Sequence, residues 1–264
     1  MNVILQCKFT PLKVFLIIAR FIFTLYGFCV FLSLMILLFP FIVVASFFGR
    51  VKGGNIIYKL CRFWGDACLF LGGIYHKNIY ESPHDRSNPY IFVSNHISYF
   101  DIPVMMKAVR KQHLRILAKA EMSKIPIFGF IYRSAAVLVH RENIQERAKS
   151  VQILKSILKR RISVFICPEG TFNMTHHPLK SFYDGAFRIA IETQTPIKPI
   201  LFLDSYDRMN YNSVFSLNPG RSRAVYLSET CTKGMTLRDV TSLKEKIYRQ
   251  MEDGLLRYKA SWIK

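Results

Sequence analysis

The feature that most constrains this chain is a long apolar run near its N-terminus. Between Val14 and Phe48 the only charged residue is Arg20. A membrane-spanning helix needs about 20 consecutive apolar residues, so the run exceeds one span and is short for two complete spans. It is also too long for a secretory signal peptide, and no small-residue cleavage site follows it. We therefore expect a membrane-anchoring segment rather than a core helix of a soluble protein.

Basic residues flank this run on both sides, with Lys8 and Lys13 before it and Arg50 and Lys52 after it. In membrane proteins such charge collects on the cytoplasmic side. Both ends of the run are therefore expected to face the cytoplasm, together with the rest of the chain. This predicts an N-terminal helical hairpin that enters the membrane, bends near Pro40 and returns. A single tilted span is the alternative.

The overall composition also favours a membrane surface as partner. The formal net charge is +20, and 51% of the residues are hydrophobic. Basic proteins that bind nucleic acid are rarely this apolar, whereas a basic protein held against an anionic membrane leaflet combines both properties. The six cysteines include no C-x-x-C pair, so nothing indicates a disulfide framework or a zinc site. A reducing compartment that faces the cytoplasm fits this pattern.

The remainder of the chain alternates between short β-rich runs and helical stretches. The β-rich runs lie at 90–94, 115–119, 136–140, 162–167, 197–203 and 223–227, and the helical stretches at 144–160, 184–194 and 236–258. Such alternation predicts an α/β fold with a mostly parallel twisted sheet flanked by helices. We divide the chain into a membrane-anchoring segment (1–52), an amphipathic connecting helix (53–84) and an α/β domain (85–264).

The stretch SNHISYFD, residues 94–101, places a histidine and an aspartate directly after a predicted strand. One interpretation is a helix start, because Ser98 and Asp101 have the spacing of a capping box. The other is a general base, His96, oriented by Asp101. On a continuous helix, five residues turn by about 500° and leave the two side chains about 140° apart. A direct hydrogen bond therefore requires His96 to precede the helix on a turn.

Two more polar segments follow predicted strands. The stretch FICPEGTF, residues 165–172, ends a strand in a turn that carries Glu169, Gly170 and Thr171, and Arg141 follows another strand. Taken alone, each of these is an ordinary turn or a surface charge. In parallel sheets, however, binding sites form at the carboxyl ends of the strands. This common placement favours a shared site with His96.

In their order and spacing, these motifs resemble the glycerolipid acyltransferase family, which includes the 1-acylglycerol-3-phosphate acyltransferases. The resemblance covers roughly residues 85 to 205 and makes 85–264 the acyltransferase catalytic domain. The family's N-H-x-x-x-x-D motif is matched by Asn95, His96 and Asp101, its Pro-x-x-Gly stretch and strand-end arginine by Pro126, Gly129 and Arg141, its Pro-Glu-Gly-Thr block by Pro168 to Thr171, its later strand by Pro196 and Pro199, and its helix entry by Lys180, Phe182, Gly185 and Ala186.

The resemblance implies a membrane-bound O-acyltransferase of phospholipid biosynthesis. Such an enzyme moves a fatty acyl chain from an acyl thioester to the free hydroxyl of lysophosphatidic acid and yields phosphatidic acid. The thioester, acyl-CoA or acyl-acyl carrier protein, is a co-substrate, and no cofactor or metal is expected. Acyl carrier protein is thus a candidate partner besides the anionic membrane surface.

The resemblance also assigns roles to individual residues. His96 acts as general base, and Asp101 accepts a hydrogen bond from its other ring nitrogen. Glu169, Gly170 and Thr171 position the glycerol of the acceptor. Arg141 binds the acceptor phosphate, and Lys119, at the end of RILAK, is a second phosphate contact.

One departure from the family pattern leaves the acceptor open. After Pro-Glu-Gly-Thr the family often has Arg-Ser, whereas this chain has Phe172 and Asn173, so a cation expected near the phosphate is missing. A lyso-aminolipid or another hydroxyl acceptor is the alternative.

A metal-dependent phosphoesterase using His96, His176 and His177 is disfavoured, because the chain has no H-x-H or H-x-x-x-H spacing. A non-enzymatic basic membrane adaptor would explain the charge but would leave the motifs as coincidence.

Overall fold

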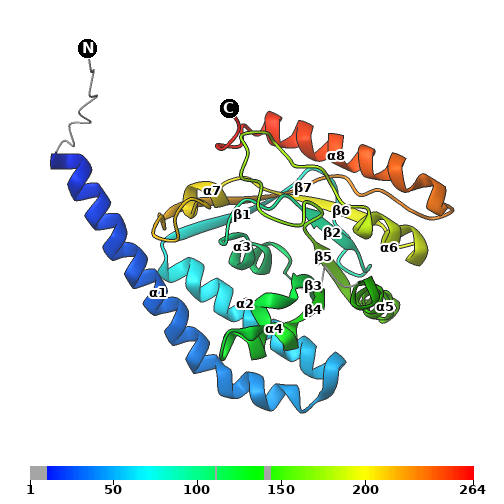
Figure 1. Ribbon diagram of the computed structural model, residues 1–264, viewed down its shortest axis with the longest axis horizontal. Helices are drawn as coiled ribbons and strands as arrows, with labels where there is room; N and C mark the ends of the chain where they lie inside the picture. Colours follow the sequence, from blue (N-terminus) through cyan, green and yellow to red (C-terminus); the bar gives the residue numbers. More distant parts are fainter. Residues whose placement is uncertain (1–10, 111, 140–143) are drawn as a thin grey trace.

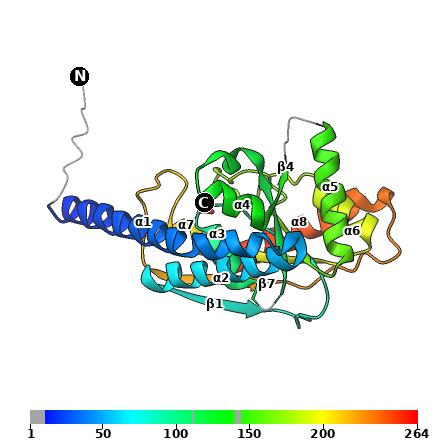
Figure 2. The ribbon, with the colours of Figure 1, turned by 90° about the horizontal axis from the view of Figure 1, so that it is seen from below.

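Two long helices precede an α/β domain (Figure 1). The computed structural model describes residues 11–110, 112–139 and 144–264. Helix α1 (Pro11–Ser46) is joined to helix α2 (Gly54–Leu71) by a π-helical turn (Gly49–Gly53). Figure 2 shows α1 lying along α2, with the N-terminal part of α1 extending beyond the domain. A helical hairpin is therefore present, but it is formed by α1 and α2 and not within residues 1–52, where it was expected.

The position of the bend in this hairpin was predicted wrongly. Helix α1 runs without interruption through Pro40 over 36 residues, which makes it about 54 Å long. A proline removes one backbone hydrogen bond and kinks a helix, but the surrounding apolar turns continue on both sides. The chain reverses only after Ser46, so the returning arm is α2, which the sequence analysis had treated as a separate connecting helix.

Glycines allow the reversal at this place. Gly49 has a φ of +77°, a left-handed conformation that glycine adopts without steric cost. Gly53 packs against the end of α1 so closely that an added Cβ would lie 2.3 Å from the carbonyl oxygen of Ala45. The tight turn therefore depends on residues without side chains.

The domain is built on a seven-stranded sheet with the strand order β1-β7-β6-β2-β5-β3-β4. The strands are β1 (Ile74–Tyr80), β2 (Ile91–Ser94), β3 (Leu114–Lys119), β4 (Ala136–Val139), β5 (Ser163–Ile166), β6 (Ile197–Phe202) and β7 (Gly220–Tyr226). Strands β2 to β6 run parallel, and β7 is antiparallel to β6 and parallel to β1. The predicted fold class, a mostly parallel sheet flanked by helices, is confirmed.

Helices cover both faces of the sheet. Besides α1 and α2, the helices are α3 (Asp101–Ala108), α4 (Phe128–Ala135), α5 (Ile144–Lys159), α6 (Gly185–Thr193), α7 (Ser205–Arg208) and α8 (Val240–Arg257), with short 3₁₀ turns at Ala120–Lys124 and Leu237–Asp239. Alternate residues of β2 enter separate cores: Ile91 and Val93 pack with α5, α6 and α8, and Phe92 packs with α2 and α3. Strand β2 is buried on both faces and is the central strand of the seven, so its carboxyl end lies in the middle of one edge of the sheet.

The sheet begins earlier than the sequence analysis expected. Strand β1 lies within 53–84, the segment assigned to a connecting helix, yet it pairs with β7 along its whole length, from Ile74 opposite Gly220 to Tyr80 opposite Tyr226. This pairing joins segments far apart in the chain, so no local pattern announces it. The α/β domain therefore includes residues before 85.

Candidate active site

The site is built where the chain leaves the carboxyl end of β2. Asn95, the first residue after the strand, donates from Nδ2 to the carbonyl of Phe202 over 3.0 Å and accepts from the Phe202 N–H over 2.8 Å. These two bonds tie the end of β2 to the end of its neighbour β6. The turn that carries the next residue, His96, therefore starts from a fixed point in the sheet.

His96 and Asp101 are in direct contact. His96 precedes α3, which begins at Asp101, and its Nδ1 lies 2.8 Å from Asp101 Oδ2. The same oxygen accepts the backbone N–H groups of Ile97, over 2.8 Å, and Ser98, over 3.0 Å. Asp101 thus orients the imidazole and accepts two N–H groups of the turn that precedes α3. The capping box does not form, because Phe100 is the N-cap residue of α3 and makes no side-chain cap hydrogen bond, and the Ser98 hydroxyl accepts the Phe100 N–H over 2.9 Å.

These contacts determine which nitrogen of His96 faces a substrate. Because Asp101 Oδ2 already accepts two backbone N–H groups, it accepts from the ring as well, so Nδ1 carries the proton and Nε2 keeps its lone pair. No hydrogen bond joins Nε2 to any residue that the structure describes. The His96 side chain is 24% exposed and that of Asp101 only 4%. The imidazole is therefore reachable and its partner is shielded from water.

Two aromatic rings pack beside the imidazole. The Phe172 ring lies edge-on to His96, with centroids 4.4 Å apart, and Tyr99 packs on Phe172 with centroids 4.7 Å apart. Phe172 occupies the position at which the resemblance had suggested a cation. An apolar wall thus replaces a positive charge on this side of the base.

Glu169 holds the surrounding loops together. Its side chain is buried, and Oε1 accepts the His96 N–H and Oε2 the Lys180 N–H, each over 2.9 Å. Burial raises the pKa of this carboxyl to about 7, although the two backbone N–H groups oppose the shift. Sequence analysis expected Glu169 to position the glycerol of an acceptor. The two hydrogen bonds show that Glu169 also links the turn of His96 to the loop of Lys180, and its role toward the acceptor stays a prediction.

Gly170 and Thr171 complete the turn after β5. Gly170 has a φ of +74° and donates its N–H to the carbonyl of Cys167 over 3.0 Å, so the turn needs a left-handed residue here. Thr171 is exposed, and its hydroxyl accepts a bond from Lys180 Nζ over 2.7 Å. Lys180 was assigned only to a helix entry and not to the site. Its position near Thr171 depends on a loop that folds back, which no local pattern in the sequence signals.

The two predicted phosphate contacts have different outcomes. Lys119 ends β3, is 51% exposed and lies 3.3 Å from Glu121 Oε1. Strand β5 separates β3 from β2, so the structure does not bring Lys119 into contact with the His96 pair. Arg141 lies outside the described residues, although β4, which precedes it, ends at the same edge of the sheet.

The histidines of the phosphoesterase alternative do not gather into a ligand set. His176 Nδ1 lies 3.2 Å from the carbonyl oxygen of Trp262 near the C-terminus. Within the described parts of the chain, no group of three His, Cys, Asp or Glu side chains is placed to hold a metal ion. The geometry therefore lends no support to that alternative.

Comparison with known proteins agrees with the site. A family model described as Acyltransferase matches residues 75–203. The chain is 30% identical over 167 residues to human 1-acyl-sn-glycerol-3-phosphate acyltransferase alpha, covering 62% of this chain and 58% of the human protein. It is 28% identical over 195 residues to the chloroplastic 1-acyl-sn-glycerol-3-phosphate acyltransferase LPAT1 of Arabidopsis thaliana, covering 73% of this chain and 52% of that protein. The chain thus spans little more than half the length of these two relatives.

A solved structure shares the fold. The crystal structure of the 1-acyl-sn-glycerophosphate (LPA) acyltransferase PlsC from Thermotoga maritima superposes with a TM-score of 0.73 at 22% identity, covering 94% of this chain and 99% of that one. The family match includes the turn after β2 and the turn after β5, the two segments that form the site described above. By sequence and by fold, the chain is therefore similar to acyltransferases that include the 1-acyl-sn-glycerol-3-phosphate acyltransferases.

Proposed function

We propose that this protein transfers a fatty acyl chain from an acyl thioester to the free hydroxyl of lysophosphatidic acid and so forms phosphatidic acid. The observation that carries the proposal is the His96–Asp101 pair at the end of β2, with Nε2 of the imidazole directed away from its carboxylate partner. Relatives named for this reaction support the choice of substrates. Acyl-CoA or acyl-acyl carrier protein would be the donor, and acyl carrier protein a partner in the second case.

The chemistry follows from the orientation of the imidazole. His96 Nε2 takes the proton of the acceptor hydroxyl as its oxygen attacks the thioester carbonyl. The buried carboxylate of Asp101 stabilises the imidazolium that forms. When the carbon–sulfur bond breaks, the imidazolium returns the proton to the departing thiolate. The ester bond forms directly, so no covalent acyl-enzyme is required.

The acceptor is recognised by cations at the same edge of the sheet. In the proposal, Arg141 binds the acceptor phosphate and Lys119 is a second, outer contact, while Gly170 and Thr171 shape the turn beside the glycerol. The apolar Phe172 next to His96 is the observation that favours the alternative, a lyso-aminolipid or another hydroxyl acceptor. The chemistry at His96 is the same for either acceptor.

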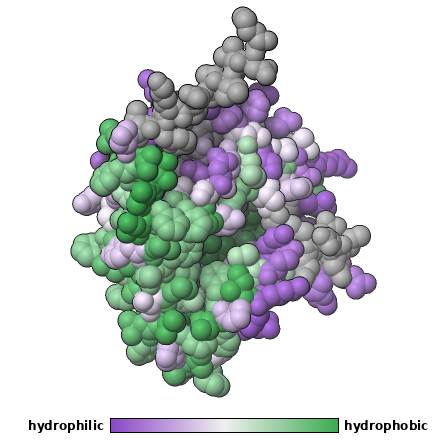
Figure 3. All heavy atoms as spheres, turned by 60° about the vertical axis from the view of Figure 1, so that its left-hand side comes forward, coloured by the Kyte–Doolittle hydropathy of each residue, from purple (hydrophilic) through white to green (hydrophobic). Residues whose placement is uncertain are grey.

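Helix α1 supports a location at the membrane. It is long and apolar enough to cross a bilayer. Most of its apolar side chains are exposed, and the face that carries it is largely hydrophobic (Figure 3). Its other side packs on α2, where Trp64 Nε1 donates to the Phe31 carbonyl over 3.4 Å. We propose that the hairpin of α1 and α2 embeds in the cytoplasmic leaflet, which keeps both its ends on one side.

An assay with several acceptors tests the proposed reaction. Purified protein is given one acyl-CoA and, separately, lysophosphatidic acid, a lyso-aminolipid and monoacylglycerol, and the products are separated by chromatography. Lysophosphatidic acid is expected to react fastest, and His96→Ala to lower the rate by about 10²- to 10⁴-fold. Faster transfer to the lyso-aminolipid would favour the alternative acceptor. Absence of transfer to every acceptor would refute the proposed reaction, and the non-enzymatic membrane adaptor would remain as the alternative function.

The membrane location has its own test. Protein mixed with anionic vesicles is expected to float with them, and deletion of residues 1–46 is expected to weaken flotation. Single cysteines placed at Lys13 and Arg50 should resist labelling from outside intact cells. Labelling of one of the two positions would contradict the embedded hairpin and favour a single span.

A further inference from the structure

The turn after β5 receives a positive charge from further along the chain. Lys180 Nζ donates to the hydroxyl of Thr171 over 2.7 Å, and the Lys180 backbone N–H donates to Glu169 over 2.9 Å. Lys180 is partly exposed and Thr171 is exposed, so both remain accessible to a ligand. A lysine from a separate loop thus brings an accessible ammonium group to the turn after β5.

The charge of Lys180 is not offset within the described parts of the chain. None of their carboxylate oxygens lies within 4.0 Å of Nζ. The carboxylate of Glu169 accepts backbone N–H groups on both oxygens, and Asp184, in the same loop as Lys180, pairs with Lys244 over 2.6 Å. Lys119, by comparison, has Glu121 at 3.3 Å. An ammonium group has three donors, so Lys180 can bind Thr171 and an anion at once.

Lys180 and the general base are joined through one side chain. Glu169 accepts the backbone N–H of His96 on one oxygen and that of Lys180 on the other. In lysophosphatidic acid the carbon next to the reacting hydroxyl carries the phosphate. An acceptor that gives its proton to His96 Nε2 therefore carries its phosphate only a few bonds from the imidazole, on a scale at which groups of the adjoining turn can reach it. We propose that Lys180, a residue outside the roles assigned above, binds the phosphate of the acceptor.

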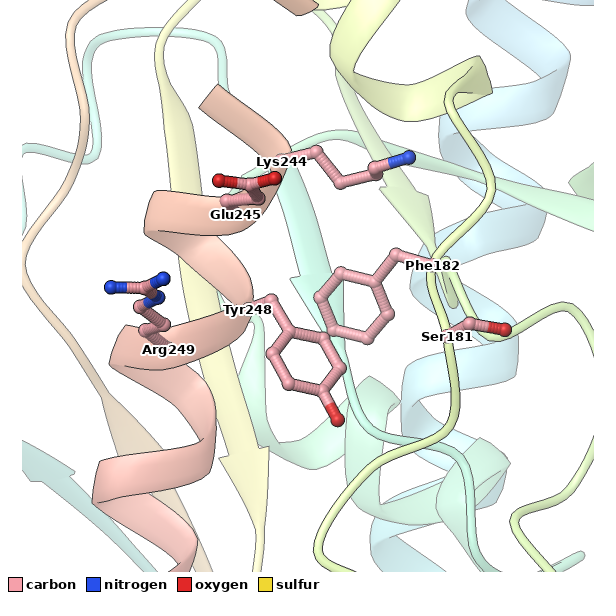
Figure 4. Close-up of a pocket in the computed structure, with 6 residues that line it drawn as sticks. All are labelled: Ser181, Phe182, Lys244, Glu245, Tyr248 and Arg249. Carbon is pink, nitrogen blue, oxygen red and sulfur yellow. The ribbon is translucent and has the colours of Figure 1, made fainter. Parts of the chain in front are cut away.

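The loop that carries Lys180 is held in place from helix α8. Leu179 and Phe182, on either side of Lys180, are buried. The Tyr248 hydroxyl donates to the Leu179 carbonyl over 3.3 Å, and its ring packs edge-on against that of Phe182, with centroids 5.1 Å apart (Figure 4). With its neighbours anchored, Lys180 loses little further freedom when it binds an anion, which favours affinity.

The acyl donor also carries phosphate groups, on coenzyme A or on the pantetheine arm of a carrier protein. We assign Lys180 to the acceptor phosphate and not to the donor, because Glu169 links Lys180 to His96, and His96 must meet the acceptor hydroxyl. It therefore rests on the proposed function, and the kinetic test must separate the two substrates. The donor phosphate is the competing outcome.

Two substitutions distinguish phosphate binding by Lys180 from a role limited to its hydrogen bond with Thr171. Lys180→Gln keeps an N–H donor for the hydroxyl but removes the charge, whereas Lys180→Arg keeps the charge. Lys233→Gln is the matched control, because Lys233 is exposed and follows Thr230, which bridges to Ile197 at the opposite end of β6. Thermal denaturation checks that each variant is folded, and Lys180→Met serves as a second neutral variant.

The measured quantities are the KM values for lysophosphatidic acid and acyl-CoA, and the preference for lysophosphatidic acid over monoacylglycerol, which lacks phosphate. Lys180→Gln is expected to raise the KM for lysophosphatidic acid about 10- to 100-fold, the range of a charge-assisted hydrogen bond, and to lower the preference similarly. The KM for acyl-CoA should stay near the wild-type value. Lys180→Arg should recover most of the loss, and Lys233→Gln should behave as wild type.

Three results would overturn the inference. An unchanged KM for lysophosphatidic acid in Lys180→Gln would show that the charge is not used. A raised KM for acyl-CoA alone would assign Lys180 to the donor. Equal KM values for lysophosphatidic acid in Lys180→Arg and Lys180→Gln would show that Lys180 serves only as a hydrogen-bond donor to Thr171. If wild-type protein transfers to no acceptor, the proposed function fails by itself, and equilibrium binding of labelled lysophosphatidic acid in micelles decides the inference: equal binding by wild type and Lys180→Gln refutes it.

Discussion

Replacing Asp101 with asparagine removes a negative charge from beside His96 and leaves the local geometry almost intact. In the wild type, Asp101 Oδ2 accepts from the imidazole and from the backbone N–H groups of Ile97 and Ser98. In Asp101→Asn, an amide nitrogen at the position of Oδ2 would face three N–H donors. The amide oxygen of the asparagine must therefore occupy that position. The NH₂ group then occupies the position of Oδ1, which is buried and has no hydrogen-bond partner among the described residues. The tautomer of His96 is preserved.

The cost to catalysis is therefore that of the lost charge. Two unit charges about 4 Å apart interact by about 4 kcal/mol at an effective dielectric constant of about 20. A hydrogen bond from the charged imidazolium to the neutral amide oxygen retains about 1.5 kcal/mol. We expect a net loss of about 2–3 kcal/mol in the transition state, which corresponds to about 30- to 150-fold in kcat. Asp101→Ala should lose more, because the N–H groups of Ile97 and Ser98 then lack an acceptor, and its stability should fall as well.

The assay is the initial rate of thiol release from acyl-CoA with lysophosphatidic acid as acceptor, both saturating. Asp66→Asn is the control for loss of a carboxylate, since Asp66 pairs with Lys107 and Arg110 away from the site, and its kcat should equal that of wild type. A kcat of Asp101→Asn within about threefold of wild type would show that the charge is not used. A loss as large as that of His96→Ala would show that the tautomer is not preserved.

Three further predictions concern stability and the acceptor. Burial raises the pKa of Glu169 from 4.5 to about 7, so the fold is most stable with this carboxyl protonated and loses stability as the pH rises between those values. Glu169→Gln should abolish this pH dependence, which amounts to up to about 3 kcal/mol in the free energy of unfolding. Equal slopes of stability against pH for wild type and Glu169→Gln would contradict the prediction. Gly53→Ala should lower the melting temperature, because its Cβ would lie 2.3 Å from the Ala45 carbonyl, while Gly185→Ala, with open space around it, should not; equal melting temperatures would argue against the tight turn. Phe172→Arg should lower the KM for lysophosphatidic acid and leave that for acyl-CoA unchanged; a raised acceptor KM would favour the alternative acceptor.

Local patterns in the sequence predicted most of the elements. The alternation of β-rich runs and helical stretches indicated the strands from β2 to β7 because each buries its own apolar residues within a few positions. His96 and Asp101 could be linked in advance because only a short turn separates them. The motifs around them then indicated the family before any geometry was known.

Contacts between distant segments could not be predicted in the same way. The pairing of β1 with β7 and the bond from Lys180 to Thr171 depend on how the whole chain closes around the sheet. The carboxylate of Glu169 was recognised as part of a motif, yet its hydrogen bonds to the backbone of two other segments could not be read from that motif. A motif identifies the residue, and only its neighbours define its role.

By itself, the sequence determined the class of fold, the apolar N-terminal helix and the pairing of His96 with Asp101, because periodicity, composition and short spacing are local properties of the chain. Only the tertiary structure decided where the hairpin reverses, which nitrogen of His96 is left free by Asp101 and which lysine reaches the hydroxyl of Thr171. These depend on steric fit at Gly53, on the acceptor shared at Asp101 and on the folding back of the loop at Lys180. Each of them arises from contacts that exist only once segments remote in the chain have packed together.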